Sequence, residues 1–212
     1  MKRQFKDIFP KKNSIIGMVH LQALPGTPAC EYEIDEIIEK ALTDAAIYLL
    51  AGVDGLMIEN MHDVPYLNRE VGHEITAAMS VISKEIKKEI PLPCGVQVLA
   101  GANESALAVA KAAGLEYVRA EGFVFGHIAD EGWMNSDAGT LLRYRKVIGA
   151  EDVLVFNDIK KKHSSHVVTA DVGLVETAKA AEYFRSDGLI ITGSSTGVAT
   201  DLKEIKAVKK EC

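Results

Sequence analysis

The sequence predicts an α/β fold built on a parallel, barrel-type sheet. Three observations lead to this class: short β-branched runs alternate with amphipathic segments, most runs end in a polar residue, and the unit recurs along all 212 residues. Strands that alternate with helices form parallel sheets, and in a closed βα barrel the carboxyl ends of the strands form the active face. We therefore expect a TIM-type (β/α) barrel that carries about six of the eight usual units.

The predicted strands are the β-branched runs, and most of them have a polar residue at the tip. They cover residues 15–19 ending at His20, 56–58 ending at Glu59 and Asn60, 95–99, 117–120 ending at Glu121, 153–156 ending at Asn157 and Asp158, and 189–191 ending at Thr192. Closure of the barrel would point these tips toward one mouth.

The predicted helices occupy the stretches where apolar residues recur at helical spacing. They cover residues 34–49, 75–86, 103–113, 141–148, 172–178 and 202–208. Gly52 and Gly114 offer the left-handed conformation that ends many helices. Asn103, Asp171 and Asp201 are expected to open the third, fifth and sixth helices as capping residues.

Composition limits the class of protein and its partners. No low-complexity linker interrupts the units, so we expect one domain over residues 1–212. A hydrophobic content of 48% suits an aliphatic core, and a net charge of −6 argues against a nucleic-acid partner. Cys30, Cys94 and Cys212 have no disulfide or zinc spacing. With neither a secretory signal nor a membrane-spanning run expected, the prediction is a cytoplasmic protein without a membrane partner.

Three strand tips form the central candidate site. His20, Glu59 and Asp158 follow the first, second and fifth predicted strands. They suit a general acid/base set, or a cluster that holds a divalent metal through imidazole and carboxylates. No other cofactor is identified. A histidine at a strand end can instead simply complete a hydrogen bond. Asn60, beside Glu59, is assigned to substrate binding.

The densest polar cluster runs from Asp158 to His166. Lys160 and Lys162 could neutralise an anionic substrate and its developing enolate while the carboxylate shuttles a proton. A Schiff-base lysine is another reading, and the lysines, Lys161 above all, could simply be a solvated loop. His163 is a candidate acid or ligand, and His166 could equally belong to the surface.

Gln97 and Arg119 are expected to point into the barrel among aliphatic neighbours. A charged side chain such as Arg119 inside the barrel needs an oppositely charged partner, and Glu121 or Glu59 is the expected one. These residues therefore either touch substrate or form an internal salt bridge. The segment from Glu121 to Trp133 mixes aromatics with glycines, which is typical of a lid or of an oligomer surface.

The segment Thr192-Gly193-Ser194 follows the last predicted strand and precedes a helix. Its backbone N–H groups and hydroxyls could cradle a phosphate, or form a capped turn. The P-loop lysine and the dinucleotide fingerprint are both missing from this segment. Nucleotide hydrolysis and Rossmann-type binding are therefore disfavoured.

Ordered motifs run from the first predicted strand to the last predicted helix. They are Gly17-Met18-Val19-His20-Leu21 with Leu24-Pro25-Gly26, Asp54-Gly55, Glu59-Asn60 with Asp63-Val64-Pro65, Gly95-Val96-Gln97-Val98-Leu99, Leu141-Leu142-Arg143-Tyr144-Arg145, Asp158 with Lys162-His163, and Thr192-Gly193-Ser194. Together they resemble the BtpA family, also called the SgcQ family, of βα barrels near the ribulose-phosphate-binding kind. The resemblance implies a complete eight-unit barrel, so the last two units are expected to be absent here. Open strand edges would then favour a homo-oligomer.

The function expected from these residues is acid/base chemistry on a small anionic metabolite, a phosphorylated sugar or a nucleoside-like compound. Glu59 and Asp158 would be the central carboxylates, and Lys160, Lys162 and Arg119 would handle negative charge. The family name implies an alternative, since it derives from a role in photosystem I assembly or stability. A truncated, catalytically inactive barrel is the third reading.

Overall fold

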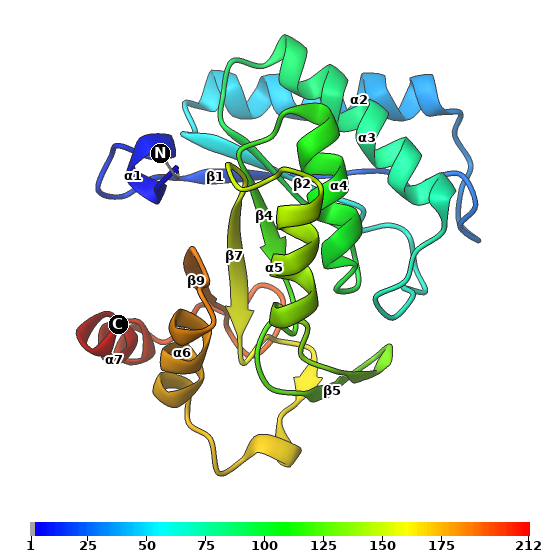
Figure 1. Cartoon of the computed structure of the whole chain (residues 1–212). Coiled ribbons are helices and arrows are strands. Elements are labelled where there is room, and N and C mark those ends of the chain that lie inside the picture. The colour runs from blue at the N-terminus through cyan, green and yellow to red at the C-terminus, as the bar shows by residue number, and fades with distance from the viewer. Residues whose placement is uncertain (1–2) are drawn as a thin grey trace.

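The computed structural model places six parallel strands in one sheet that curls into a half-barrel (Figure 1). Their order is β1 (Ile16–His20), β2 (Gly55–Glu59), β3 (Cys94–Gln97), β4 (Tyr117–Ala120), β7 (Leu154–Ile159) and β9 (Gly188–Ile191). The structure describes residues 3–212. Met1 and Lys2 lie outside the described residues. They belong to the N-terminal segment in which no secretory signal is expected. The predicted TIM-type (β/α) fold with about six units is confirmed, in the form of a half-barrel.

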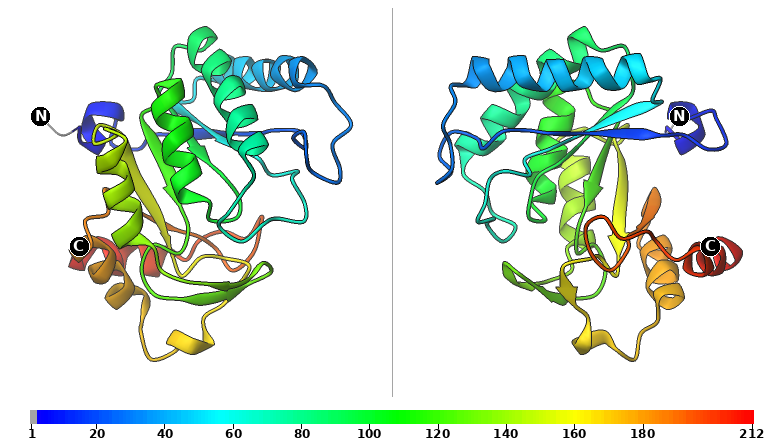
Figure 2. Two further views of the ribbon diagram at one scale, coloured as in Figure 1. Left: turned by 45° about the vertical axis from the view of Figure 1, so that its right-hand side comes forward. Right: turned by 180° about the vertical axis from the view of Figure 1, so that it is seen from behind.

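The helices pack against the outer face of the sheet. They are α2 (Ile34–Ala51), α3 (His73–Glu89), α4 (Asn103–Ala113), α5 (Ala138–Val147), α6 (Leu174–Tyr183) and α7 (Leu202–Glu211). Neighbouring helices α2 to α5 follow one another around the curve (Figure 2). Their apolar faces and the outward side chains of the strands form the larger hydrophobic core.

The helix ends agree with the sequence in some places and not in others. Gly52 and Gly114 take the expected left-handed conformation, each with φ of 78°. The Asp201 side chain accepts the Lys203 N–H and caps α7, as predicted. Asn103 was expected to cap α4, but the helix starts at Asn103 itself. The Asp171 prediction was also wrong, because α6 begins at Leu174 after Gly173.

An aromatic cluster fills the inner face of the half-barrel. The short helix α1 (Phe5–Ile8) brings Phe9 within 5.6 Å of the Tyr117 ring, and Tyr117 lies 5.3 Å from Phe156, measured between ring centroids. The Tyr117 hydroxyl donates to the Leu56 carbonyl over 2.6 Å. A side chain on neighbouring Gly95 would lie 2.2 Å from the Tyr117 ring, so only glycine fits there. This cluster was not predicted from the sequence.

A second, small sheet lies beyond the carboxyl ends of the main strands (Figure 1). The hairpin β5 (His127–Ala129) and β6 (Gly132–Met134) pairs through β5 with β8 (Ser164–Ser165), all antiparallel, and the short 3-10 helix η1 (Val167–Thr169) follows. The segment predicted to be a lid or an oligomer surface is thus a hairpin. It joins the loop after β4 to the loop after β7.

The outer strands of the main sheet are β1 and β9. Pairing of two copies along these edges remains a prediction. Within residues 3–212, no helix combines the length and hydrophobicity needed to cross a bilayer.

Candidate active site at the carboxyl ends of the strands

A cavity of about 420 Å³ opens at the carboxyl ends of the main strands. Adjacent parallel strands place their tips side by side, and His20 of β1 is in register with Glu59 of β2, which is in register with Gln97 of β3. Most of the predicted site residues line this cavity: His20, Glu59, Gln97, Arg119, Glu121, Asp158, Lys162 and His163.

The Glu59 carboxylate makes no hydrogen bond to another residue of the described chain, and its nearest ionisable partner is His20. The Oε2 atom of Glu59 lies 3.9 Å from His20 Nε2, and only 13% of the Glu59 side chain is exposed. Burial raises the pKa of Glu59; Arg119 opposes this shift and the nearby Glu121 charge adds to it. Burial, followed by the influence of His62, lowers the pKa of His20. The two opposite shifts bring the pKa values of Glu59 and His20 closer together, which favours proton transfer between them.

Arg119 of β4 and Asp158 of β7 form a buried ion pair. Guanidinium atoms Nε and Nη2 both donate to both carboxylate oxygens over 3.0–3.3 Å. The partner expected for Arg119 was Glu121 or Glu59; the structure corrects this, because β7 lies next to β4 in the sheet and presents Asp158. Burial raises the pKa of Asp158 to about 6, against the lowering influence of Arg119. Nη1 of Arg119 has no hydrogen bond within the described part of the chain.

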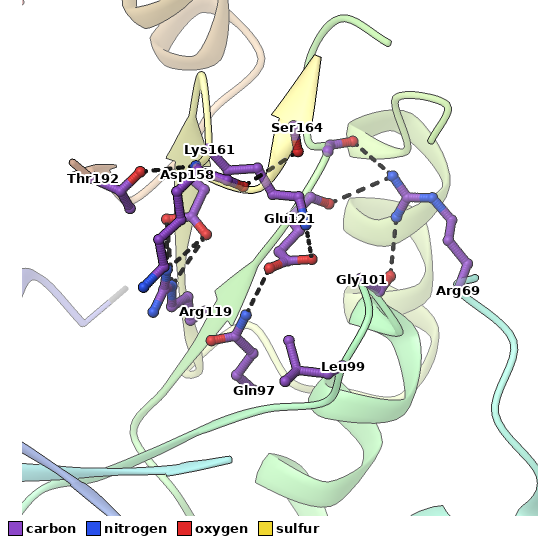
Figure 3. A network of polar contacts seen from close by, with 12 residues as sticks. Arg69, Gln97, Leu99, Gly101, Arg119, Glu121, Asp158, Lys161, Ser164 and Thr192 are labelled. Carbon is purple, nitrogen blue, oxygen red and sulfur yellow. Dashed lines mark hydrogen bonds and ion pairs between the residues drawn. The ribbon is translucent and has the colours of Figure 1, made fainter. Parts of the chain in front are cut away.

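A second buried network centres on Glu121 (Figure 3). Its Oε2 accepts from Lys161 Nζ over 3.0 Å, and its Oε1 accepts from Gln97 Nε2 over 3.0 Å. The reading of Lys161 as a solvated loop residue was wrong, because only 9% of its side chain is exposed. The hairpin covers the loop after β7 and turns Lys161 inward. A charge run alone does not reveal such tertiary cover.

Arg69 and Asn103 hold the backbone around Glu121 through hydrogen bonds. Neither role was predicted from the sequence. Asn103 accepts the Glu121 N–H and donates to the Glu121 carbonyl. Arg69 donates to the carbonyl of Gly101 (Figure 3), to the carbonyls of Gly122 and Asn135, and to the Asp137 carboxylate. Burial raises the pKa of Asp137 to about 6, against the lowering influence of Arg69. A single arginine in a loop carries no sequence signal for this role.

Lys162 and His163 form the rim of the cavity. The Lys162 N–H donates to Thr192 Oγ1 over 3.0 Å, while its ammonium group has no partner among residues 3–212. The Nε2 atom of His163 lies 2.9 Å from Thr196 Oγ1. Among the described residues, the Lys162 ammonium group is therefore a cation at this mouth without a hydrogen-bond or ion-pair partner.

Several predicted site residues lie away from the cavity. Asn60 is buried, accepts the Leu99 N–H and donates to Asp63. Lys160 Nζ donates to Thr169. Lys160 lines a separate cavity of about 490 Å³, which also contains acidic Asp201 and Glu204 together with the predicted anion loop Thr192, Gly193 and Ser194. The structure therefore does not bring these residues together with Glu59.

The proposed metal ligands do not converge as a donor set. Both oxygens of Asp158 accept hydrogen bonds from Arg119, and across residues 3–212 no three His, Cys, Asp or Glu side chains gather closely enough to hold an ion. A positive guanidinium between the carboxylates would also repel a cation. His20, Glu59 and Asp158 thus do not fit a metal site in this arrangement.

The fold defines a βα-barrel protein, and the ends of its strands bring His20, Glu59, Arg119 and Asp158 to one cavity. The chain belongs to the BtpA family, whose model matches residues 11–212. This confirms the family resemblance of the sequence motifs.

Relatives span most of the chain. An uncharacterized mitochondrial protein of Caenorhabditis elegans is 47% identical over 92% of this chain and 73% of its own length. The photosystem I biogenesis protein BtpA of Synechocystis is 30% identical over 93% of this chain and 68% of its own length. Among solved structures, the N-acetylmannosamine-6-phosphate 2-epimerase of Clostridium perfringens superimposes with a TM-score of 0.56 at 13% identity, covering 100% of this chain and 77% of the epimerase. That likeness shows the fold alone.

Proposed function

We propose that this protein is an enzyme that moves a proton on a small phosphorylated sugar or nucleoside-like metabolite at the barrel mouth. One observation carries the proposal. Glu59 has a raised pKa and no hydrogen-bond partner in the described chain, and it lines a cavity of about 420 Å³ beside Arg119. A carboxyl group with a perturbed pKa in a cleft is the expected form of a general acid or base.

The neighbouring residues take complementary roles. Asp158 holds the guanidinium of Arg119, which leaves Nη1 able to stabilise an oxyanion that develops on the substrate. His20 stands 3.9 Å from Glu59 and can accept or return its proton. Lys162 and His163 on the rim can contact a phosphate group. Lys160 and Thr192 to Ser194 have no part in this reaction, because they lie outside the mouth.

The choice of substrate class is supported by two facts. Lys162 and Arg119 Nη1 are unsatisfied cationic donors at the mouth, which suits an anionic ligand. The epimerase that shares this fold acts, by its name, on a phosphorylated sugar. Localisation in the cytoplasm remains a prediction, and the name of the Caenorhabditis elegans relative places that protein in mitochondria.

The proposal is tested in two stages. Sugar phosphates and nucleoside monophosphates are screened by thermal shift, because a ligand of the folded state raises apparent stability. Compounds that bind are then followed by NMR in deuterated water for exchange of a carbon-bound hydrogen. We expect Glu59→Gln to slow exchange by about 100-fold or more, and Glu31→Gln, on the exposed surface, to leave it unchanged. Binding by no phosphate ester, or equal exchange by Glu59→Gln, would contradict the proposal.

An assembly or stability factor is the second candidate. The Synechocystis relative is named for photosystem I biogenesis, and the cross-strand pair Ile128 and Trp133 on the hairpin is 43% and 51% exposed. Exposed apolar pairs of this kind often contact other proteins. If the protein is such a factor, the Trp133→Ser variant should no longer bind its partner protein, and the Glu59→Gln variant should still bind it. A catalytically inactive barrel would bind neither a metabolite nor a partner protein.

A further inference from the structure

Two buried oxygen atoms at the mouth lack a hydrogen-bond donor. They are Oε1 of Gln97 and Oε2 of Glu131, which have no partner within the described residues although both residues line the cavity. Gln97 as a whole is only 2% exposed. A buried acceptor without a donor costs free energy, so native proteins rarely leave one without a reason.

The orientation of the Gln97 amide follows from its neighbour. Glu121 is a carboxylate that already accepts from Lys161, so it can offer only an acceptor to Gln97. The Gln97 NH2 group must therefore face Glu121, which it contacts over 3.0 Å. Its Oε1 consequently points elsewhere and is left for an incoming donor.

Glu59, Glu121 and Glu131 line the cavity together with Tyr66. Glu59, Glu131 and Glu121 all act on Tyr66: after burial, which is the main cause, their charges raise the pKa of its hydroxyl. The Tyr66 hydroxyl itself donates to the Met61 carbonyl, so it does not satisfy them. Gln97 Oε1 and Glu131 Oε2 are therefore acceptors that Tyr66 leaves unsatisfied.

The cationic side chains that line the cavity do not donate to Gln97 Oε1 or Glu131 Oε2. Arg119 is paired with Asp158 through Nε and Nη2, and Lys161 is paired with Glu121, so among the described residues Arg119 Nη1 and the ammonium group of Lys162 are left without a hydrogen-bond partner. Lys162 is close enough to Glu59 to lower its pKa. An ammonium group on a ligand would be repelled by this lysine, whereas a hydroxyl group would not.

We propose that Gln97 and Glu131 determine specificity by accepting hydrogen bonds from the hydroxyl groups of the metabolite. The substrate is then a polyhydroxylated sugar phosphate whose phosphate lies on Lys162. Glu131 comes from the turn of the β5–β6 hairpin, so the small sheet is part of the binding site. This inference rests on the proposed function, since it names the ligand class of the same mouth.

The experiment measures the affinity of the full chain for four probes by isothermal titration calorimetry. The probes are D-ribose 5-phosphate, its 2-deoxy analogue, D-glucosamine 6-phosphate and D-glucose 6-phosphate. We expect the hydroxylated member of each pair to bind more tightly, and Glu131→Ala to weaken that binding at least tenfold while leaving the deoxy sugar within about twofold. Gln97→Met should act in the same direction, and Asp152→Asn on the surface is the matched control.

Each outcome bears on one of the two proposals. If none of the four sugar phosphates binds, this inference fails, whereas the proposed function fails only if nucleoside monophosphates also do not bind in the thermal-shift screen. If they bind but Glu131→Ala weakens the hydroxylated and deoxy sugars equally, or not at all, this inference fails and the proposed function stands. Tighter binding of the amino sugar than of glucose 6-phosphate would likewise overturn the hydroxyl assignment. Because Glu131 is partly exposed on a hairpin turn, its variant keeps the test valid even if the Gln97 variant does not fold.

Discussion

Asp158 and Arg119 hold each other across neighbouring strands β7 and β4, with four N···O distances between 3.0 and 3.3 Å and a fully buried Asp158 carboxylate. The pair crosses the inside of the half-barrel directly beneath the mouth. Its geometry explains how the charge of Arg119 is kept inside an aliphatic sheet, and it leaves Nη1 without a hydrogen-bond partner among the described residues.

Removal of one member of this pair should be costly. In Asp158→Asn the Arg119 charge stays buried without its counter-ion, and we expect a loss of about 3–5 kcal/mol of unfolding free energy, measured by urea denaturation. Glu151→Gln removes the exposed ion pair with Lys146 and should leave the midpoint unchanged. Equal stability of Asp158→Asn and wild type would show that the pair is absent in solution.

Glu59 should destabilise the fold at neutral pH. A carboxyl group whose pKa is raised on folding contributes stability that is complete below its unfolded pKa, about 4.3, and is lost as the pH rises through the folded value. Glu59→Gln should therefore be more stable than wild type at pH 7.5, by about 1.4 kcal/mol for each unit of raised pKa. The gain should vanish near pH 4. A constant difference across this range would argue against the raised pKa.

His127 should make the hairpin sensitive to acid. Burial, followed by the charges of Lys161, His166 and Arg69, lowers the pKa of His127 to about 4. Because the lowered pKa favours the neutral ring, the contribution of His127 to the free energy of unfolding is complete above pH ~6.5. This contribution decreases as the pH drops toward 4, by up to about 3 kcal/mol. His127→Gln should flatten this dependence in urea melts at pH 7.5 and 4.5. The exposed His73→Gln should retain it.

Phe9 should anchor the N-terminal segment to the inner face of the sheet. The Phe9 side chain is buried against Tyr117, whereas neighbouring Phe5 is 47% exposed. Phe9→Ala should cost about 3–5 kcal/mol because it opens a cavity in the aromatic cluster. Phe5→Ala should cost clearly less. Similar losses for the two variants, measured in parallel denaturant titrations, would contradict the anchoring role.

Much of the framework was predictable from local patterns. The alternation of β-branched runs and amphipathic stretches located all six strands of the main sheet and the helices that follow them, since these periods report which side chains face the core. The predictions were weakest at boundaries: Asn157 and Asp158 lie inside β7 rather than after it. Asn103 and Asp171 failed as caps because a capping residue type does not show which turn it enters.

The sequence by itself determined the order of strands and helices, the family, and the strand tips that share one mouth, because parallel strands always end on the same side of a sheet. Only the tertiary structure decided the partners within that mouth. Asp158 reaches Arg119 because β7 follows β4 in the sheet, Lys161 is buried because the hairpin covers it, and Glu131 joins the site from a turn. These pairings depend on contacts between residues distant in the chain, which no local periodicity encodes.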